Sequence, residues 1–480
     1  FVSNPEITHR FQVLSGLSDS VYVKMYSNSL GFSPNNENFL NGNTDSQING
    51  YSIIIPNNEA VRNYSKYLLK YFGTFDAAPT EVLNDFLNSH MFTTQVWPSR
   101  FSSSANFQGE IPTVPSGNIV KTSLVSNGMV FGTDRVQEAN VFRTIYAEPY
   151  LDPRYTLMIR ALNAELKYSI INNQVKYTMF MMSNTDINSA HYDWSTQRNS
   201  WAYSSTPPYT SWDYSTNARD RLYRILQTSV TQPTIDLTSL SGKGVVETYN
   251  NEYIRYSNDT VWASGNVDAG NWLVKDSSKT FVNGTVYYLH EYVPPTKLST
   301  GGLLTFTEKA IGAHIAALAT AYPTVFGHYY NYLSRSTIWT ASTQSITGTV
   351  AGGFYTIFVP TNAAIEQAVK DGMLPGSTTT GVPNFNPSAA ADKEKVVRFI
   401  QYHLLNKNTV ATDGVKNGAY ATLLADSNTD PTYVTVINHV GSMELRDAYN
   451  NSVNVIVQRS NNLSNRTLIH AIDKVLKYIY

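Results

Sequence analysis

The sequence predicts an α+β protein in which one folding unit is repeated three times along 480 residues. Two observations lead to this fold class. A strand-like run that ends in a helix cap occurs three times, and a later segment with the apolar spacing of one helical face also occurs three times. The length agrees, because a chain of this size exceeds one ordinary core and favours about three domains.

The strand-to-helix transition is clearest at residues 355–365, which read YTIFVPTNAAI. The same template of an aromatic residue, a small hydroxyl residue, an apolar run and a polar cap occurs at 51–61 (YSIIIPNNEAV) and at 177–187 (YTMFMMSNTDI). Thr361 and Asn362 lie where a side-chain oxygen can cap the free N–H groups of a following helix. Each copy therefore predicts one strand followed by one helix.

A further helix is predicted ahead of each copy. The segments PEITHRF (5–11), PYLDPRY (149–155) and PTVFGHY (323–329) share the pattern Pro-x-aliphatic-x-x-Arg/His-aromatic. Proline in the first helical turn costs no hydrogen bond, and the apolar spacing after it suits an amphipathic helix. We therefore expect each unit to open with a helix.

Another helix is predicted after each copy, within LNDFLNSH (83–90), LYRILQTS (222–229) and VVRFIQYH (396–403). The aligned positions follow the spacing of three, four and seven that marks one helical face. These positions are Leu83, Phe86, Leu87 and His90, then Leu222, Ile225, Leu226 and Ser229, then Val396, Phe399, Ile400 and His403.

Each unit closes with a turn and a strand. The segments are SNGMVFGTDRV (126–136), VNGTVYYLHEYV (282–293) and SNRTLIHAIDKVL (464–476). An Asn-Gly or Asn-Arg turn before an apolar run is typical of a hairpin return into a sheet. The predicted domains are therefore 1–139, 140–297 and 298–480, with short connectors, because no long Gly/Ser-rich or Pro-rich linker separates them.

This order of signals resembles the fasciclin domain, an α+β module in which a wedge-shaped β-sandwich has helices packed on one side. Residues 355–365 resemble the first conserved motif of that family, and residues 465–476 resemble the second. Tyr402 and His403 match its tyrosine-histidine pair. The resemblance implies three tandem fasciclin-like domains, of which the middle one is divergent.

The histidines at the helix ends are the first candidates for chemistry. His90 follows Ser89 rather than tyrosine, and the middle unit has Ser229 at the equivalent position. Each histidine lies on an apolar helical stripe, where a buried imidazole hydrogen-bonded to a carbonyl is the ordinary arrangement. We therefore interpret His90, Tyr402 and His403 as structural, although the family's pair has been linked to adhesion.

The composition excludes several classes of site. The formal net charge is −1 and only 15% of residues are charged, so no basic stripe is available for nucleic acid. The absence of cysteine excludes disulfides, thiolate zinc sites and cysteine nucleophiles. No HExxH motif or calcium-loop pattern is present, so we expect neither a metal nor a cofactor.

An enzyme is not expected, because no serine elbow and no histidine with a suitably spaced carboxylate is found. A glycan-active hydrolase that uses dispersed acids such as Glu291 or Asp473 remains an alternative. The acids Asp276, Asp426 and Asp430 are interpreted as solvated surface residues.

One insertion is unusually aromatic. Residues 191–214 read HYDWSTQRNSWAYSSTPPYTSWDY, a pattern that no helix explains. Aromatic side chains anchor protein interfaces and stack on sugar rings, so the segment predicts either a binding surface for glycan or protein, or a satellite core of its own domain. The candidate binding residues are Tyr192, Trp194, Trp201, Tyr203, Tyr209, Trp212 and Tyr214.

Two tripeptides, Asp19-Ser20-Val21 and Asp259-Thr260-Val261, resemble the acceptor for protein O-glycosylation in the periplasm of Bacteroidetes. Ser20 and Thr260 are therefore candidate modification sites. The sequon that starts at Asn283 lies in a closing segment and is interpreted as structural.

Together these features predict a non-enzymatic adhesion or interaction protein outside the cytoplasm. The chain is rich in Asn, Ser, Thr and Tyr, begins at Phe1 without a leader, and has no apolar run long enough for a membrane helix. We expect a bacterial outer-membrane lipoprotein that touches the membrane only through a lipid anchor outside this chain. Expected partners are an envelope or surface protein, such as a TonB-dependent transporter complex, or a polysaccharide held by the insertion.

Overall fold

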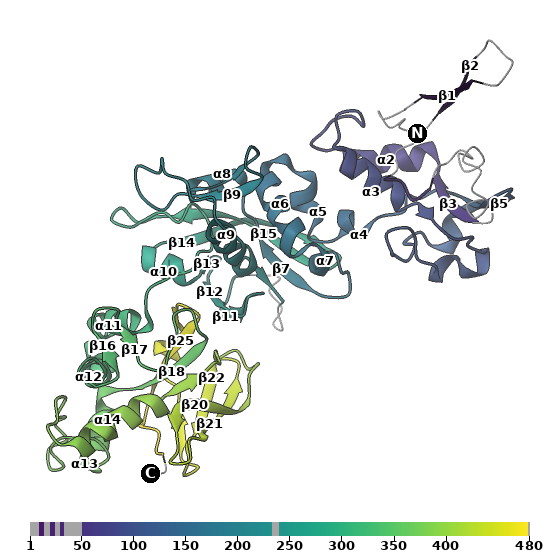
Figure 1. The fold of residues 1–480 in the computed structure, drawn as a ribbon. Coiled ribbons are helices and arrows are strands. Elements are labelled where there is room, and N and C mark those ends of the chain that lie inside the picture. The colour runs from purple at the N-terminus through teal and green to yellow at the C-terminus, as the bar shows by residue number, and fades with distance from the viewer. Residues whose placement is uncertain (1–8, 14–19, 25–28, 33–49, 233–239, 479–480) are drawn as a thin grey trace. The chain divides into compact units, whose positions relative to one another are not determined.

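The structure of the protein is a computed structural model that describes residues 9–13, 20–24, 29–32, 50–232 and 240–478 (Figure 1). Helices and sheets are both abundant, which confirms the α+β class. The chain divides into two compact units. The first contains residues 1–175 and 281–284, and the second contains residues 176–280 and 285–480.

The first unit begins with a two-stranded antiparallel sheet of β1 (His9–Val13) and β2 (Ser20–Lys24). The prediction of an opening helix at 5–11 is therefore wrong over residues 9–11, and residues 5–8 lie outside the described residues. Residues 10–13 (RFQV) alternate polar and apolar side chains, and the stretch HRFQV pairs along its whole length with SVYVK. A period of two favours a strand over a helix once a partner strand is available.

The main sheet of the first unit has the order β4-β3-β6-β5. Its strands are β3 (Tyr51–Pro56), β4 (Met91–Phe92), β5 (Ile119–Val125) and β6 (Gly128–Thr133), and β6 runs parallel to β3. Asn57 caps α2 (Asn58–Leu68) by accepting from the Ala60 N–H at 2.8 Å. The predicted second helix is α3 (Thr80–Asn88), and the connections contain η2 (Pro98–Ser103) and η3 (Ser116–Asn118). The core includes Ile54, Phe92, Phe101, Met129 and Phe131.

The first unit ends in a group of short helices, which include the segment 149–155 predicted to open the second domain with a helix. They are α4 (Asn140–Arg143), α5 (Ala147–Leu151), η4 (Pro153–Tyr155), α6 (Thr156–Glu165) and α7 (Lys167–Ile170). The turn residue Asn283 is fully buried against them. Its side chain accepts from the Ile145 N–H and donates to the Ile170 carbonyl, both at 2.8 Å. The sequon at Asn283 is thus a structural element of this unit.

The middle segment, residues 176–292 of the sequence, forms a seven-stranded sheet with the order β10-β7-β15-β14-β13-β12-β11. The strands are β7 (Tyr177–Phe180), β10 (Val230–Thr231), β11 (Lys243–Glu247), β12 (Tyr253–Ser257), β13 (Thr260–Trp262), β14 (Trp272–Phe281) and β15 (Gly284–Tyr292). The helices are α8 (Asn184–Ser189), α9 (Thr216–Thr228) and α10 (Ser264–Ala269), and Ser183 and Asp186 form a capping box at α8.

The C-terminal segment, residues 311–478, forms an eight-stranded sheet with the order β23-β22-β21-β20-β19-β18-β25-β24. The strands are β18 (Tyr355–Pro360), β19 (Leu404–Asn406), β20 (Gly418–Ala425), β21 (Pro431–His439), β22 (Ser442–Arg446), β23 (Ser452–Asn454), β24 (Asn462–Ser464) and β25 (Thr467–Ile472). The helices are α11 (Ile311–Ala321), α12 (Pro323–Ser334), α13 (Asn362–Lys370), α14 (Ala390–Tyr402) and η5 (Val457–Arg459), with a hairpin of β16 (Trp339–Thr340) and β17 (Ser345–Ile346).

Alternate residues of β18 face two different cores, which makes this segment a sandwich with helices on one side. Ile357 and Val359 pack with the residues of α11 to α14, whereas Phe358 packs with Val434, Leu445 and other residues of β20 to β23. The period of two along a strand explains how one strand serves both layers. The helix caps also follow the prediction, because the Thr361 hydroxyl accepts from the Ala364 N–H at 3.3 Å.

The predicted strand, helix and closing strand are thus present in all three parts of the chain, and β18 pairs parallel with β25 as β3 does with β6. The three sheets lie within 1–139, 140–297 and 298–480, whereas the compact units divide after residue 175. The division into three domains therefore stays a prediction. Within the described residues, no helix is both long enough and apolar enough to cross a membrane.

Candidate functional site

The aromatic segment, defined as residues 191–214, is built on a hairpin of β8 (Tyr192–Ser195) and β9 (Ser200–Tyr203). Tyr192 pairs with Tyr203 and Trp194 pairs with Trp201, so the aromatic side chains meet across the hairpin. The ring centroids are 4.5 Å apart in the first pair, which is stacked, and 5.3 Å apart in the second, which meets edge to face. Such cross-strand aromatic pairs stabilise an isolated hairpin.

The structure divides the candidate residues of this segment by burial. Tyr192 and Trp201 are buried, each with 3% exposure, so they belong to the core. Trp212 and Tyr214 expose 38% and 36% of their surface. Trp194, Tyr203 and Tyr209 are half-buried, and the Tyr209 ring stacks on His191. A binding role for the segment stays a prediction, and only Trp212 and Tyr214 present large exposed rings for it.

Arg221 on α9 holds the segment in place. Its guanidinium carbon lies 4.8 Å from the Tyr203 ring and 5.0 Å from the Phe306 ring, and it pairs with Glu308. Burial raises the pKa of Tyr192, which therefore stays neutral beside this cation. A guanidinium packed between aromatic faces fixes their orientation, so the segment is anchored to the helix behind it.

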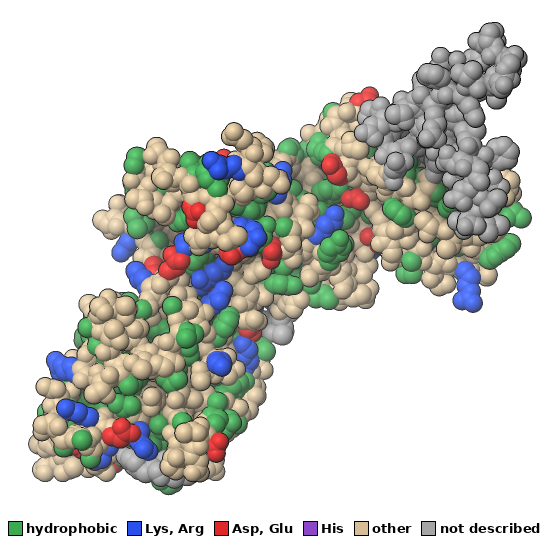
Figure 2. All heavy atoms as spheres, in the orientation of Figure 1, with side chains coloured by type: hydrophobic (Ala, Val, Ile, Leu, Met, Phe, Trp, Pro, Cys, Tyr) green, Lys and Arg blue, Asp and Glu red, His purple; other side chains and the backbone are tan. Residues whose placement is uncertain are grey.

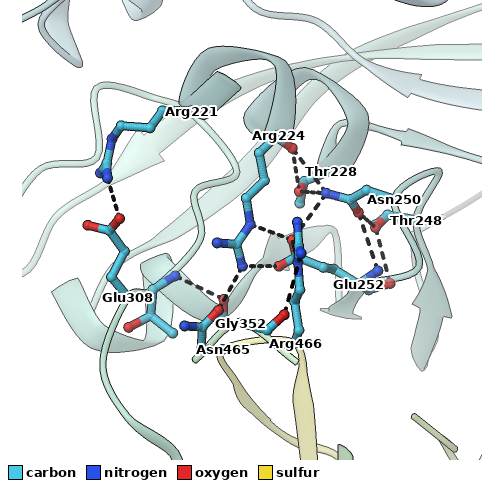
Figure 3. Close-up of polar contacts among 12 residues, drawn as sticks. Arg221, Arg224, Thr228, Thr248, Asn250, Glu252, Glu308, Gly352, Asn465 and Arg466 are labelled. Carbon is cyan, nitrogen blue, oxygen red and sulfur yellow. Dashed lines mark hydrogen bonds and ion pairs between the residues drawn. The ribbon is translucent and has the colours of Figure 1, made fainter. Parts of the chain in front are cut away.

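One turn further along α9, Arg224 enters a second cluster, the charged junction, which we define as Arg224, Asn250, Glu252, Asn465 and Arg466 (Figure 3). The Glu252 side chain is 5% exposed and accepts from two nitrogens of Arg224, Nε to Oε1 at 2.5 Å and Nη2 to Oε2 at 3.0 Å. Arg466 Nε reaches the same Oε1 at 3.3 Å. A buried carboxylate held by two guanidinium groups is compensated in charge and geometry.

The charged junction joins the middle segment to the C-terminal segment, both of which lie in the second unit. Arg224 Nη2 also donates to Asn465 Oδ1 at 2.9 Å, and Arg466 Nη1 donates to the Gly352 carbonyl at 3.4 Å. Lys416 pairs with Glu247 at 2.8 Å nearby. An apolar cluster of the same two segments contains Val245, Tyr253, Ala411, Leu463 and Leu468, with Trp262 packed against it.

Arg466 was not recognised as a contact residue from the sequence, although one signal was available. The closing turns elsewhere read Asn127-Gly128 and Asn283-Gly284, whereas here arginine follows Asn465. Arg466 has a φ of +50°, in the left-handed region that disfavours residues other than glycine. A residue other than glycine in this backbone conformation is strained, so its side chain is a candidate for a contact that offsets the strain. The Arg466 side chain makes such a contact with Glu252.

The helix-end histidines are buried and hydrogen-bonded to the backbone, and their interpretation as structural residues stays a prediction. His403 is fully buried, its Nδ1 donates to the Phe399 carbonyl at 2.7 Å, and its Nε2 accepts from the Leu476 N–H at 3.0 Å. His90 makes the matching bonds with Phe86 and Gln137. Burial lowers the pKa of His90 to about 4 and that of His403 to about 3, so both imidazoles are neutral.

Tyr402 and Ser229 complete the comparison of these helix ends. The buried Tyr402 hydroxyl donates to the Tyr433 carbonyl at 2.9 Å, which ties α14 to β21. Ser229 reproduces only half of the histidine's role, because its hydroxyl donates to the Ile225 carbonyl at 3.0 Å. None of these groups presents a free titratable atom at a surface.

The dispersed acids have structural partners. Glu291 accepts from Asn271, Ser299 and Thr300 and so holds the loop after β15. Asp473 accepts from the backbone and side chain of Asn454 at 2.8 and 3.0 Å. Among the described residues, no three His, Cys, Asp or Glu side chains gather where they could hold a metal.

One surface hollow of about 350 Å³ lies beside α11, α12 and the start of α13. It is lined by Ala319, Thr320, Pro323, Gly327, His328, Tyr330, Asn331 and Asn362, without a carboxylate. The hollow therefore lacks the pair of acids that glycoside hydrolysis requires.

The two candidate modification sites are placed differently. Thr260 begins β13, is half-buried, and donates to the Ser257 carbonyl at 2.5 Å within a tight turn. Ser20 begins β2, but its side chain lies outside the described residues. O-glycosylation of either residue stays a prediction.

Comparison with known proteins assigns the C-terminal segment. Residues 334–478 match the family model of the fasciclin domain. A similar solved structure is the FAS1 domain pair from the insect cell adhesion molecule fasciclin I, with 14% identity, coverage of 68% of this chain and 97% of that chain, and a TM-score of 0.30. No curated protein matches the sequence. Fasciclin domains are in general adhesion or interaction modules found outside the cell. Residues 334–478 thus carry the sequence features of a fasciclin domain.

Proposed function

We propose that this protein is a non-enzymatic adhesion or interaction protein of the cell surface. The observation that carries the proposal is the fasciclin domain at 334–478, whose tyrosine and histidine are both buried and bonded to the backbone. Because these two side chains are buried in the core, the residues that contact a partner must lie on the outer surface of the domain. Its mechanism is then surface complementarity with a partner.

The setting that we propose is the bacterial outer membrane, where the protein is a lipoprotein subunit of a surface assembly, anchored by a lipid outside this chain. Its partner is an envelope protein, such as a TonB-dependent transporter complex. The exposed rings of Trp212 and Tyr214 support a contact through the aromatic segment, since exposed tryptophan and tyrosine are the side chains that most often anchor interfaces.

The experiment is purification of the tagged full-length protein from membranes after mild cross-linking, with identification of the proteins recovered. A double variant, Trp212→Ala with Tyr214→Ala, should lose the partner while its melting temperature changes little. Tyr449→Ala is the matched control, because Tyr449 is 57% exposed and lies outside the aromatic segment. If the wild type, the double variant and Tyr449→Ala recover the same partner equally, the aromatic segment does not take part in the contact.

A second candidate is a glycan-binding accessory protein of a polysaccharide-uptake system. The same two exposed rings favour it, because aromatic faces stack on sugar rings. Affinity electrophoresis of the purified protein in gels that contain candidate polysaccharides distinguishes the two. A retardation that is lost in the double variant and retained in Tyr449→Ala would support glycan binding.

A further inference from the structure

Two arginines of the second unit differ from the other arginines by having no carboxylate partner despite partial burial. Six of the ten arginines between residues 176 and 478 pair with an Asp or Glu within 4.0 Å, namely Arg219, Arg221, Arg224, Arg398, Arg446 and Arg466. Arg198 and Arg335 are exposed to water. Arg255 and Arg459 remain, both partly buried and, within the described part of the chain, without an ion pair.

Arg255 lies on β12, with its guanidinium carbon 5.6 Å from the centre of the Trp262 ring. Its Nη1 donates to the Asn461 carbonyl at 3.4 Å, a long bond to a neutral group. Burial lowers the pKa of Arg255, and the group that opposes this effect is the Tyr322 hydroxyl rather than a carboxylate. A cation that has lost part of its water and gained no anion is an unfavourable arrangement unless a ligand supplies the charge.

Arg459 lies close to Asn461 in the chain and packs on the ring of Tyr322, with its guanidinium carbon 4.3 Å from the ring centre. Its Nη1 donates to the neighbouring Gln458 carbonyl at 3.2 Å. Tyr322 is 38% exposed, so its ring is accessible from solvent beside Arg459. Because Arg255 bonds to the Asn461 carbonyl and Arg459 precedes Asn461 by two positions, both arginines lie at the turn before β24, where Arg459 packs on an exposed aromatic ring.

We propose that Arg255, Arg459 and Tyr322 form a binding site for a uronic acid residue of an acidic polysaccharide. Arginine presents paired N–H donors in the geometry that a carboxylate accepts. The exposed Tyr322 ring supplies an apolar face for the C–H groups of the sugar. A uronic acid carries both features on one ring, whereas an Asp or Glu side chain carries only the carboxylate.

The charge of the whole protein argues against a general polyanion site. The net charge is −1, and on the face shown in Figure 2 the Lys and Arg side chains are interspersed with Asp and Glu side chains and form no continuous basic stripe. A nucleic acid needs several cations spaced along its backbone. A site with two arginines instead recognises one anionic group. It shares no residue with the aromatic segment, so it can fail without affecting the proposed function.

The experiment is calorimetric titration of the purified full-length protein with trigalacturonate at low salt, with the methyl ester of the same trimer as the uncharged control ligand. We expect binding of the acid, and at least about tenfold weaker binding of the ester, as expected for loss of hydrogen bonds to a charged group. Arg255→Gln and Arg459→Gln should each weaken binding by a similar factor. Arg335→Gln is the matched control, because Arg335 is exposed and pairs with no carboxylate in the part of the chain that the structure describes.

Three results of these titrations would overturn the proposal of a uronic acid site. Equal affinity for acid and ester, or unchanged affinity in both Arg255→Gln and Arg459→Gln, would overturn the proposal. Tighter binding of an Asp- and Glu-rich peptide than of trigalacturonate would also overturn it, in favour of a protein ligand. If Arg255→Gln melts early, Arg459→Gln alone decides, since Arg459 takes no part in the apolar cluster between the two segments.

Discussion

The closing segments at 282–293 and 464–476 occupy the same place in their sheets, but their contacts differ. In the first, the side chain of Asn283 bonds to the backbone at Ile145 and Ile170. In the second, Arg466 bonds to Glu252, and the Leu476 N–H bonds to the imidazole of His403. Closing strands at corresponding places in two sheets therefore make different contacts at their turns.

Removal of the shared carboxylate should produce the largest effect. Glu252→Ala leaves Arg224 and Arg466 without a counter-ion at a buried site, and we expect a loss of about 3–5 kcal/mol in the free energy of unfolding. Urea denaturation measures it. Glu252→Gln keeps the shape and most hydrogen bonds, so it should lose less. An Ala variant as stable as the wild type would show that the charged junction contributes nothing.

Asn283→Ala tests the other closing turn. The variant leaves the buried Ile145 N–H and Ile170 carbonyl without partners, and we expect a loss of about 2–3 kcal/mol. Thermal unfolding and amide exchange at residues 140–175 report on it. Exchange that increases equally across residues 311–478 would contradict a local role for this asparagine.

A pH titration separates the closing segment that bonds to a buried imidazole, that of His403, from the closing segment at 282–293, whose turn bonds through Asn283. His403 is neutral when folded, with a pKa of about 3, whereas the unfolded chain takes up a proton near pH 6.5. The unfolded state therefore binds more protons between these values, and stability falls as the pH falls, by up to about 1.4 kcal/mol per pH unit for each such histidine. His90 and His470, each with a pKa of about 4, act in the same direction.

The slope of stability against pH should be smaller in His403→Gln than in the wild type. Urea midpoints at pH 7, 6 and 5 measure the slope. Ser229→Ala, at the equivalent position of the middle segment, should leave the slope unchanged because serine does not titrate in this range. Equal slopes in His403→Gln and the wild type would show that His403 is not the titrating group.

The smallest effect is expected for Arg466→Gly, which gives this turn the Asn-Gly sequence of the other two. Glycine relieves the backbone at a φ of +50° by about 1 kcal/mol but loses the contact with Glu252, so the net change should lie within about 1 kcal/mol. Arg466→Ala loses the contact without the relief and should be less stable than the glycine variant. The difference between their urea midpoints measures the free energy that the left-handed backbone conformation costs at a residue other than glycine.

The local elements could be predicted because their signals are local. The strand at 355–360, the Thr361 cap and the helix after it are determined within a dozen residues, by alternation, a side-chain oxygen and helical spacing. The same reasoning failed at residues 9–11. There a proline and apolar spacing indicated a helix, but pairing with residues 20–24 gave a strand.

The interaction surfaces could not be predicted in the same way. The sequence showed a dense group of aromatic residues at 191–214, yet only the structure separates the buried Trp201 from the exposed Trp212. Alternation on a short hairpin and its contact with Arg221 decide which rings turn inward. Composition carries no information on that choice.

By itself, the sequence determined the repeated strand, helix and closing strand, the buried histidine at the end of α14, and the resemblance that the family match at 334–478 supports. Only the tertiary structure decided that Glu252 meets Arg466 across 214 residues, and that Arg255 bonds to the Asn461 carbonyl, near Arg459, without an ion pair among the described residues. The physical reason is the distance along the chain over which each interaction acts. Caps and helical faces depend on neighbours in the chain, whereas the pairing of charges depends on which surfaces the folded segments bring together.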